Sequence, residues 1–134
     1  MKVVIAGSAS LQKDIKRWVK YWNGKKGHTV INYPEALPKK DFDANYPGVH
    51  KKFFQDITET NILFIANEKK KGIDGYIGSE TFAEMAFGVA QNLLYGKNIK
   101  VLLARMPAKN VGCFEEIKLW LRLGWCVLVT HMAG

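Results

Sequence analysis

Two glutamates, Glu80 and Glu84, follow a glycine-bearing segment in the middle of the chain, and their spacing indicates chemistry. Side chains four residues apart lie on the same face of a helix. An acid in the first turn of a helix is explained by the helix dipole, which accounts for Glu80. The dipole accounts less well for Glu84, because it lies beyond the first turn among apolar residues, where a carboxylate must find partners or water. Glu84 is therefore our first candidate for a functional group.

Two glycine-bearing loops are the places where a ligand could approach the backbone. The turn Gly7–Ser10 follows a short apolar run and offers backbone N–H groups and hydroxyls, with Ser8 foremost, to a sugar or a phosphate. It is too short for a Walker or dinucleotide fingerprint, and an ordinary strand-to-helix turn capped by Ser10 would look the same. The second loop spans residues 67–78, and its candidate binding residues are Asn67, Asp74, Tyr76 and Gly78.

Short apolar runs alternate with amphipathic segments along the whole chain. We expect strands at residues 3–6, 28–33, 61–67, 99–103 and 125–129. Helices should follow the capping residues Ser10 and Ser79, begin at Pro47, and cover the region after Phe114, with residues 34–46 irregular. This alternation predicts one flavodoxin-like, doubly wound α/β domain over residues 1–134, with a five-stranded parallel sheet in the order 2-1-3-4-5. Ligands bind such sheets outside the carboxyl ends of the first and third strands, where both loops meet.

Several segments carry a resemblance to a known family. They are Asp56, the strand Ile62–Asn67, the helix start Glu80–Phe87, and Gly96-Lys97 before the strand that ends at Leu103. Together they resemble the nucleoside 2-deoxyribosyltransferase family, which includes deoxynucleoside monophosphate N-glycosidases and has a Gly-Thr-x-x-Glu-Leu-Gly-x-Ala helix start. The resemblance covers about residues 1–105, and it implies the same fold. The sequence departs from the family at Glu80, where glycine is usual, and near Gly78, where the family's base-contacting acid would fall.

The resemblance implies that Glu84 is a nucleophile, that Asp56 lies near the reacting sugar and base, and that Ser8 belongs to the hydroxyl-bearing turn. Attack of a carboxylate on the anomeric carbon gives a covalent glycosyl-enzyme. A second acid, Asp56, Glu80 or Asp74, would protonate the leaving base or activate the acceptor. Water as acceptor makes the enzyme a hydrolase, and another base makes it a transferase.

The ligand expected from this resemblance is a nucleoside or nucleotide, with no cofactor. A partner such as Tyr76, Asn67 or a serine of the first turn would keep Glu84 ionised. The family builds its pocket at a subunit interface, and the aromatic residues Trp120 and Trp125 also favour a homodimer or higher homo-oligomer. Two alternatives stay open: a non-catalytic nucleotide-binding or sensing domain, favoured by Glu80, and an unrelated flavodoxin-like binder of FMN or a protein.

The formal net charge is +8, and lysine supplies nearly all of the positive charge. Nucleic-acid grooves usually rely on arginine with interleaved aromatic residues, whereas the chain has only Arg17, Arg105 and Arg122. We therefore expect a solvated basic surface and no nucleic-acid partner. A phosphorylated small substrate is compatible with this charge.

The two cysteines, Cys113 and Cys126, fall on different expected elements, and no Cys–His cluster occurs. Neither a disulfide framework nor a metal site is therefore expected. The amino-terminal residues enter a strand pattern directly and lack the long apolar region of a signal peptide. Since no apolar run approaches the ~18 residues of a membrane span, we expect a cytoplasmic protein without a membrane partner.

Overall fold

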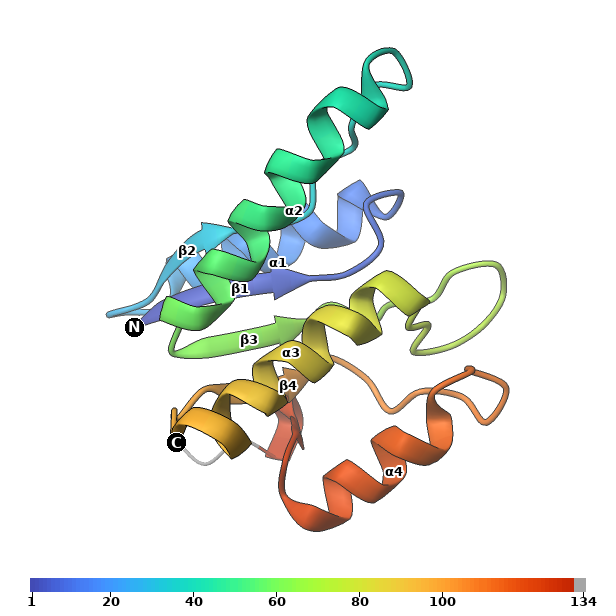
Figure 1. Ribbon diagram of the computed structural model, residues 1–134. Helices are drawn as coiled ribbons and strands as arrows, with labels where there is room; N and C mark the ends of the chain where they lie inside the picture. The colour runs from blue at the N-terminus through green and yellow to red at the C-terminus, as the bar shows by residue number, and fades with distance from the viewer. Residues whose placement is uncertain (132–134) are drawn as a thin grey trace.

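Five strands form one all-parallel sheet in the order β2-β1-β3-β4-β5 in the computed structural model, which describes residues 1–131 (Figure 1). The strands are β1 (Lys2–Ala6), β2 (Thr29–Asn32), β3 (Ile62–Ile65), β4 (Lys100–Leu103) and β5 (Val127–Leu128). All four residues of β3 are buried, as expected of a central strand covered on both faces. The predicted flavodoxin-like fold and strand order are thus confirmed.

The sheet is covered on both faces by helices. These are α1 (Gln12–Gly24), α2 (Phe42–Glu59), α3 (Ser79–Tyr95) and α4 (Phe114–Leu123). Ile15 and Trp22 of α1 pack in one core cluster, whereas Ile57 of α2, Met85 of α3 and Ile117 of α4 pack in the cluster on the opposite face. Figure 1 shows α2 and α3 in front of the sheet and α1 behind it. The successive crossovers therefore change face after α1, which leaves a crevice between β1 and β3 at their carboxyl ends.

The second helix begins earlier than the sequence predicts. It starts at Phe42, after Asp41 in a left-handed conformation, so that Pro47 lies inside the helix rather than at its first position. Pro47 removes one helical hydrogen bond close to the start of the helix. A ladder of aromatic rings spaced four residues apart supports this first part of α2: Phe42 stacks on Tyr46, and Tyr46 stacks on His50.

The predicted serine caps are absent. The residue before α1 is Leu11, and the Ser10 hydroxyl instead contacts the Ser8 hydroxyl at 3.0 Å. Ser79 is the first residue of α3 rather than its cap, which is Gly78. Neither α1 nor α3 therefore begins with a side-chain hydrogen bond from its capping residue.

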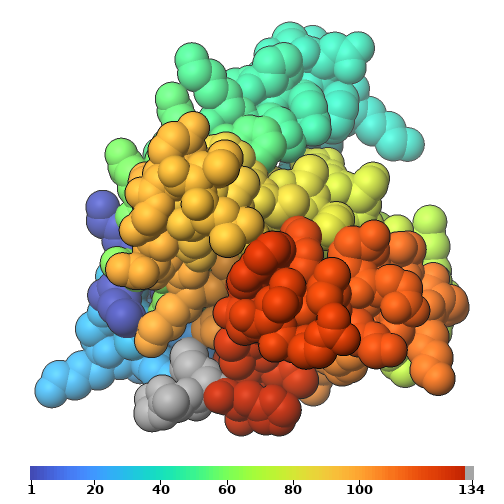
Figure 2. Space-filling view, turned by 60° about the horizontal axis from the view of Figure 1, so that its bottom comes forward, coloured from blue at the N-terminus to red at the C-terminus, as the bar shows by residue number. Residues whose placement is uncertain are grey.

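Figure 2 shows the face of the molecule on which the end of α3 and α4 lie side by side. At the end of α3, the apolar side chains of Leu93, Leu94 and Tyr95 are 56%, 72% and 70% exposed. Trp125 is partly exposed beside Trp120. The predicted assembly into a homo-oligomer stays a prediction.

The two cysteines, Cys113 and Cys126, are both free thiols, and burial raises the pKa of Cys126 to about 12. A 3₁₀ turn, Val129–His131, follows β5, and residues 132–134 lie outside the described residues. Among the described helices, none combines the length and the apolar character that crossing a membrane requires.

Candidate active site

A cavity of about 670 Å³ opens at the carboxyl edge of the sheet, between the segments that follow β1 and β2 and the loop that leads from β3 into α3. Its walls come from the β1–α1 turn, the segment after β2, the first turns of α2, and the loop that leads into α3. This is the crevice where doubly wound sheets bind their ligands. The volume falls in the range of small-molecule sites, about 300–1,000 Å³.

Most of the residues nominated by the sequence come together in this cavity. Its lining includes Gly7, Ser8, Tyr76, Gly78, Glu80 and Glu84. Asp56, Asn67 and Asp74 are not among the lining residues. The two loops therefore meet as the topology predicts, although Asn67 and Asp74 of the second loop do not face the cavity.

Glu84 is a buried carboxylate without a hydrogen-bond partner. Its side chain is only 5% exposed, yet it lines the cavity, and within residues 1–131 no group donates a hydrogen bond to it. Burial, and then the charge of Glu80, raise the pKa of Glu84 to about 8. The sequence predicts a donor such as Tyr76, Asn67 or a serine of the first turn, and none of them fills this role. Burial and Glu80 therefore favour the protonated form of the Glu84 carboxyl at neutral pH.

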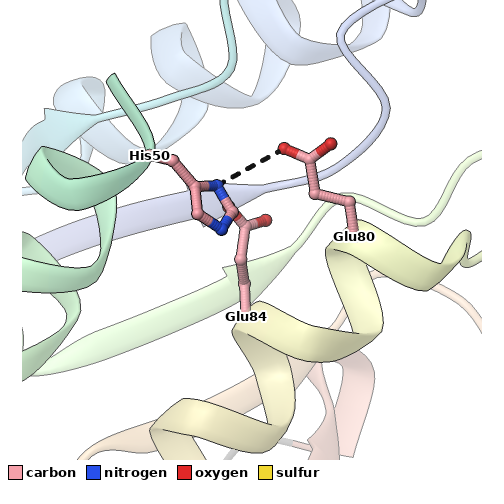
Figure 3. A group of neighbouring side chains, drawn as sticks. All are labelled: His50, Glu80 and Glu84. Atoms are coloured by element: carbon pink, nitrogen blue, oxygen red, sulfur yellow. Dashed lines mark ion pairs between the residues drawn. The ribbon is translucent and has the colours of Figure 1, made fainter. Parts of the chain in front are cut away.

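His50 faces both glutamates from α2 and was missed by the sequence-based reasoning. Its Nδ1 lies 3.8 Å from an oxygen of Glu80, and ligand atoms of His50, Glu80 and Glu84 lie within 4.8 Å of one another (Figure 3). The spacing of four residues from Tyr46 to His50, and from there to the ring of Phe54, is the signal that could have placed it on this face. One imidazole and two carboxylates could hold a divalent cation or could carry out acid–base chemistry.

Aromatic side chains form much of the remaining wall. Tyr33, Phe42, Tyr46, Phe53 and Tyr76 all line the cavity. Burial and the charges of Glu80 and Glu84 raise the pKa of Tyr46, so its hydroxyl stays protonated and can donate a hydrogen bond. Flat rings beside polar groups suit a planar heterocycle, which binds by stacking and is oriented by a few hydrogen bonds.

A lysine closes the cavity on the side of the β1–α1 turn. Lys70 Nζ donates to Ser8 Oγ at 2.6 Å and lies 5.3 Å from the centre of the Tyr76 ring. In the part of the chain that the structure describes, no carboxylate forms an ion pair with Lys70. The cavity therefore holds an acidic end at Glu84 and a cationic end at Lys70. The sequence hides this role, because Lys70 stands in a run of three lysines that resembles an ordinary solvated surface.

Asp56 stands behind the cavity wall. It is 5% exposed, and its carboxylate accepts hydrogen bonds from Asn32 Nδ2 at 2.9 Å and from Lys52 Nζ at 2.6 Å. Both donors line the cavity, whereas Asp56 does not. Asp56 therefore orients two wall residues, and its carboxylate has its principal partners already satisfied.

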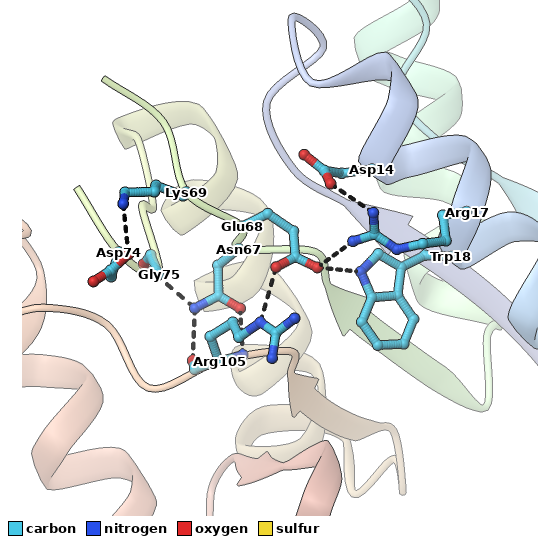
Figure 4. A network of polar contacts seen from close by, with 9 residues as sticks. All are labelled: Asp14, Arg17, Trp18, Asn67, Glu68, Lys69, Asp74, Gly75 and Arg105. Atoms are coloured by element: carbon cyan, nitrogen blue, oxygen red, sulfur yellow. Dashed lines mark hydrogen bonds and ion pairs between the residues drawn. The ribbon is translucent and has the colours of Figure 1, made fainter. Parts of the chain in front are cut away.

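Asn67 anchors the loop before α3 to the loop after β4. Its amide donates to the backbone oxygens of Arg105 at 2.7 Å and Gly75 at 3.3 Å, and it accepts a hydrogen bond from the Arg105 N–H (Figure 4). Asp74 is exposed and pairs with Lys69 at 3.8 Å. These two predicted site residues thus stabilise the loop rather than face the ligand space.

Glu68 holds the same loop against α1. It is buried, and it accepts hydrogen bonds from Arg17, Trp18 and Arg105 at 2.8–2.9 Å (Figure 4). Burial alone would raise the pKa of Glu68. The net pKa is nevertheless lowered, because the carboxylate is stabilised by hydrogen bonds from Arg105 and Trp18 and by the charges of Arg105 and Arg17. Glu68 is therefore a charged anchor that fixes the loop carrying Lys70 and Tyr76.

A scan against protein-family models finds no match to the chain, and neither the comparison with curated proteins nor that with solved structures finds one. The fold and the site nevertheless define a class. The chain is a flavodoxin-like α/β protein with an aromatic cavity at the switch point of its sheet, acidic at one end and cationic at the other.

Proposed function

We propose that this protein cleaves or transfers at the N-glycosidic bond of a nucleoside or nucleoside monophosphate, with Glu84 as the nucleophile. The observation that carries the proposal is the unpartnered, buried carboxylate of Glu84, which opens into an aromatic-lined cavity at the switch point. Retaining glycosidases use such a carboxylate to attack the anomeric carbon. The family resemblance around Glu80–Phe87 supports the same assignment.

In this reaction a Glu84 oxygen attacks C1′ of the sugar, and the bond from C1′ to the base nitrogen breaks. The product of the first step is a glycosyl ester on Glu84 together with the free base. Water or a second base then attacks C1′, releases the sugar and regenerates the carboxylate. The aromatic wall supports binding of the base, and the open acidic face of α3 supports placement of the sugar between Glu80 and Glu84.

Only the ionised form of Glu84 is nucleophilic, and a pKa raised to about 8 makes the carboxylate the minor form at pH 7. A desolvated carboxylate is a stronger nucleophile than one held by hydrogen bonds, because it loses no partner on attack. The imidazole of His50 lies close enough to favour the carboxylate when it is protonated.

The cationic end of the cavity supports a phosphorylated substrate. Lys70, the Ser8 hydroxyl and the backbone N–H groups of the β1–α1 turn are of the kinds that bind phosphate oxygens. A 5′-phosphate placed there would put the sugar between this turn and α3. The arrangement therefore favours a nucleoside monophosphate over a free nucleoside.

Incubation of the protein with a panel of nucleosides and their monophosphates, with and without an acceptor base, tests the proposal. We expect the wild type to release base, and Glu84→Gln to bind substrate but to react more slowly by several orders of magnitude. Glu59→Gln, an exposed change at the far end of α2, is the matched control and should keep full activity. Full activity in Glu84→Gln would contradict the assignment.

A second candidate is a nucleotide-binding or sensing domain without turnover. The observation in its favour is the pKa of Glu84, which keeps the carboxyl mostly protonated at neutral pH beside a second acid, Glu80. Such a domain would bind nucleotides from the same panel without releasing base. Calorimetric binding together with an unchanged substrate after long incubation would favour this candidate.

A further inference from the structure

His50 of α2 lines the cavity across from the two glutamates at the start of α3. Its Nδ1 lies 3.8 Å from a carboxylate oxygen of Glu80. One ring nitrogen of His50 and one carboxylate oxygen each of Glu80 and Glu84 all lie within 4.8 Å of one another. Figure 3 shows the nitrogen-bearing edge of the ring directed toward the two carboxylates. The imidazole therefore lies on the side of the cavity where the proposed reaction would take place.

The surrounding side chains fix the orientation of this ring. Tyr46 stacks on it at a centroid distance of 5.0 Å with planes 17° apart, and Phe54 meets it edge-on at 4.5 Å. The side chain is 25% exposed, so it remains open to the cavity that it lines. A histidine that only filled space would direct its nitrogens to solvent or to the backbone, whereas these nitrogens face carboxylates.

The carboxylates first considered as the second acid are less suitable. Asp56 is occupied by Asn32 and Lys52 behind the wall, and Asp74 lies outside the cavity. Glu80 is 60% exposed, and its nearest partner is His50 itself. Glu80 therefore stands in the position of a group that orients an imidazole, as the third member of a catalytic triad does.

We propose that His50 delivers the proton that leaves with the base, with Glu80 as its positioning residue; this inference rests on the proposed function. As the C1′–N bond breaks, its electron pair passes to the base nitrogen, which takes the proton from His50, while a Glu84 oxygen forms the new bond to C1′. In the second step the neutral imidazole takes the proton of the attacking water, and the ester bond to Glu84 breaks. One proton is thus given and recovered in each cycle.

Two substrates with the same sugar separate a proton donor from a structural residue. One is an ordinary guanine nucleoside monophosphate, whose base leaves as a neutral molecule only when it gains a proton. The other carries N7-methylguanine, which is already cationic and leaves without one. We expect His50→Gln to lower kcat/KM for the ordinary substrate by about 10²–10⁴, and for the methylated substrate by less than about tenfold.

The controls address folding and the histidine change itself. His28→Gln alters a histidine that packs on Trp22, away from the cavity lining, and should leave both rates unchanged. His50→Phe preserves the ring between Tyr46 and Phe54, and if His50→Gln fails to fold, this variant should show the same selective loss. Thermal unfolding of each variant shows that the folded state is retained.

Three outcomes would overturn the inference. If His50→Gln lowered kcat/KM equally for both substrates, His50 would have a structural role only. If kcat/KM were unchanged for both, His50 would take no part in the reaction. A wild type that releases neither base would instead refute the proposed function, and the inference with it. A selective loss on the ordinary substrate alone supports both.

Discussion

The protonation of Glu84 decides what this site can do. Its pKa of about 8 arises from burial and from Glu80 on the next turn, and the groups of α2 that face it are His50 and Tyr46. Glu84 must be ionised to act as a nucleophile. In these surroundings its carboxylate form is strongly nucleophilic but is the minor form at neutral pH. Two measurements at the residue scale follow from this balance.

The first concerns the pH dependence of the reaction. With the N7-methylguanine substrate, whose departure needs no proton from His50, we expect kcat/KM to rise about tenfold per pH unit below pH 8 and to level off above it, because the carboxylate form of Glu84 increases in that range. Glu80→Gln removes the neighbouring charge and should move the midpoint to lower pH. Initial rates between pH 5.5 and 9.5 on wild type and Glu80→Gln provide the test. A rate that falls through the same range would identify Glu84 as a protonated acid instead.

The second concerns stability and needs no substrate. The pKa of Glu84 is raised on folding, so its ionisation destabilises the native state as pH rises from the unfolded value of about 4.5 toward 8. Glu84→Gln should therefore gain stability over wild type with rising pH, on the order of 5 kcal/mol at pH 9 and almost nothing at pH 4. Urea unfolding at both pH values measures this, with Glu59→Gln as control. An equal difference at both pH values would show that burial does not shift this group.

At the scale of elements, the loop between β3 and α3 is the part of the fold that shapes the site. Gly75 has a φ of 62°, and a Cβ atom there would lie 2.6 Å from the backbone of Met106 and Pro107. Only glycine permits this close approach. With the anchors Asn67 and Glu68, it holds the loop so that Lys70 reaches Ser8 on the other side of the crevice.

This loop geometry predicts a preference for phosphorylated substrates. Lys70→Met keeps the aliphatic stem but removes the charge, and it should weaken binding of a nucleoside monophosphate by about ten- to hundredfold, because a charge-assisted hydrogen bond contributes about 1.5–3 kcal/mol. Binding of the free nucleoside should be nearly unchanged. Lys69→Met is the matched control, since its ammonium pairs with Asp74 outside the cavity. Calorimetry measures the affinity of each variant for both ligands. If Lys70→Met lost the same affinity for the nucleoside as for the monophosphate, Lys70 would not bind the phosphate.

For the molecule as a whole, the sequence carries most of the fold. Alternating apolar runs and amphipathic segments are enough to predict strand order 2-1-3-4-5 and the meeting of Ser8 and Glu84 at one cavity. The ends of the helices are less predictable. Pro47 indicates a helix start, but α2 begins earlier, at Phe42, where the aromatic ladder supports its first turns. Local signals do not reveal such side-chain stacking.

The candidate site is only partly predictable for a similar reason. Glu80 and Glu84 share one helix, so their spacing alone predicts their proximity. His50 reaches them from another helix, and whether it does so depends on the packing of α2 on α3. Asn67 shows the converse, because its position after β3 suggests a ligand role while its amide is used by Arg105 and Gly75. Tertiary contacts decide both cases.

The central claim is a covalent bond between Glu84 and a sugar, and a trapped intermediate tests it most directly. A slow 2-fluoro sugar nucleotide is incubated with the wild type, which is then cut after lysine and analysed by mass spectrometry. The peptide of residues 72–97 holds both Glu80 and Glu84, and that of residues 53–69 holds Asp56. We predict one glycosyl adduct on the first peptide, placed on Glu84 by its fragment ions and absent from Glu84→Gln. An adduct on Glu80 or on Asp56 would contradict the account.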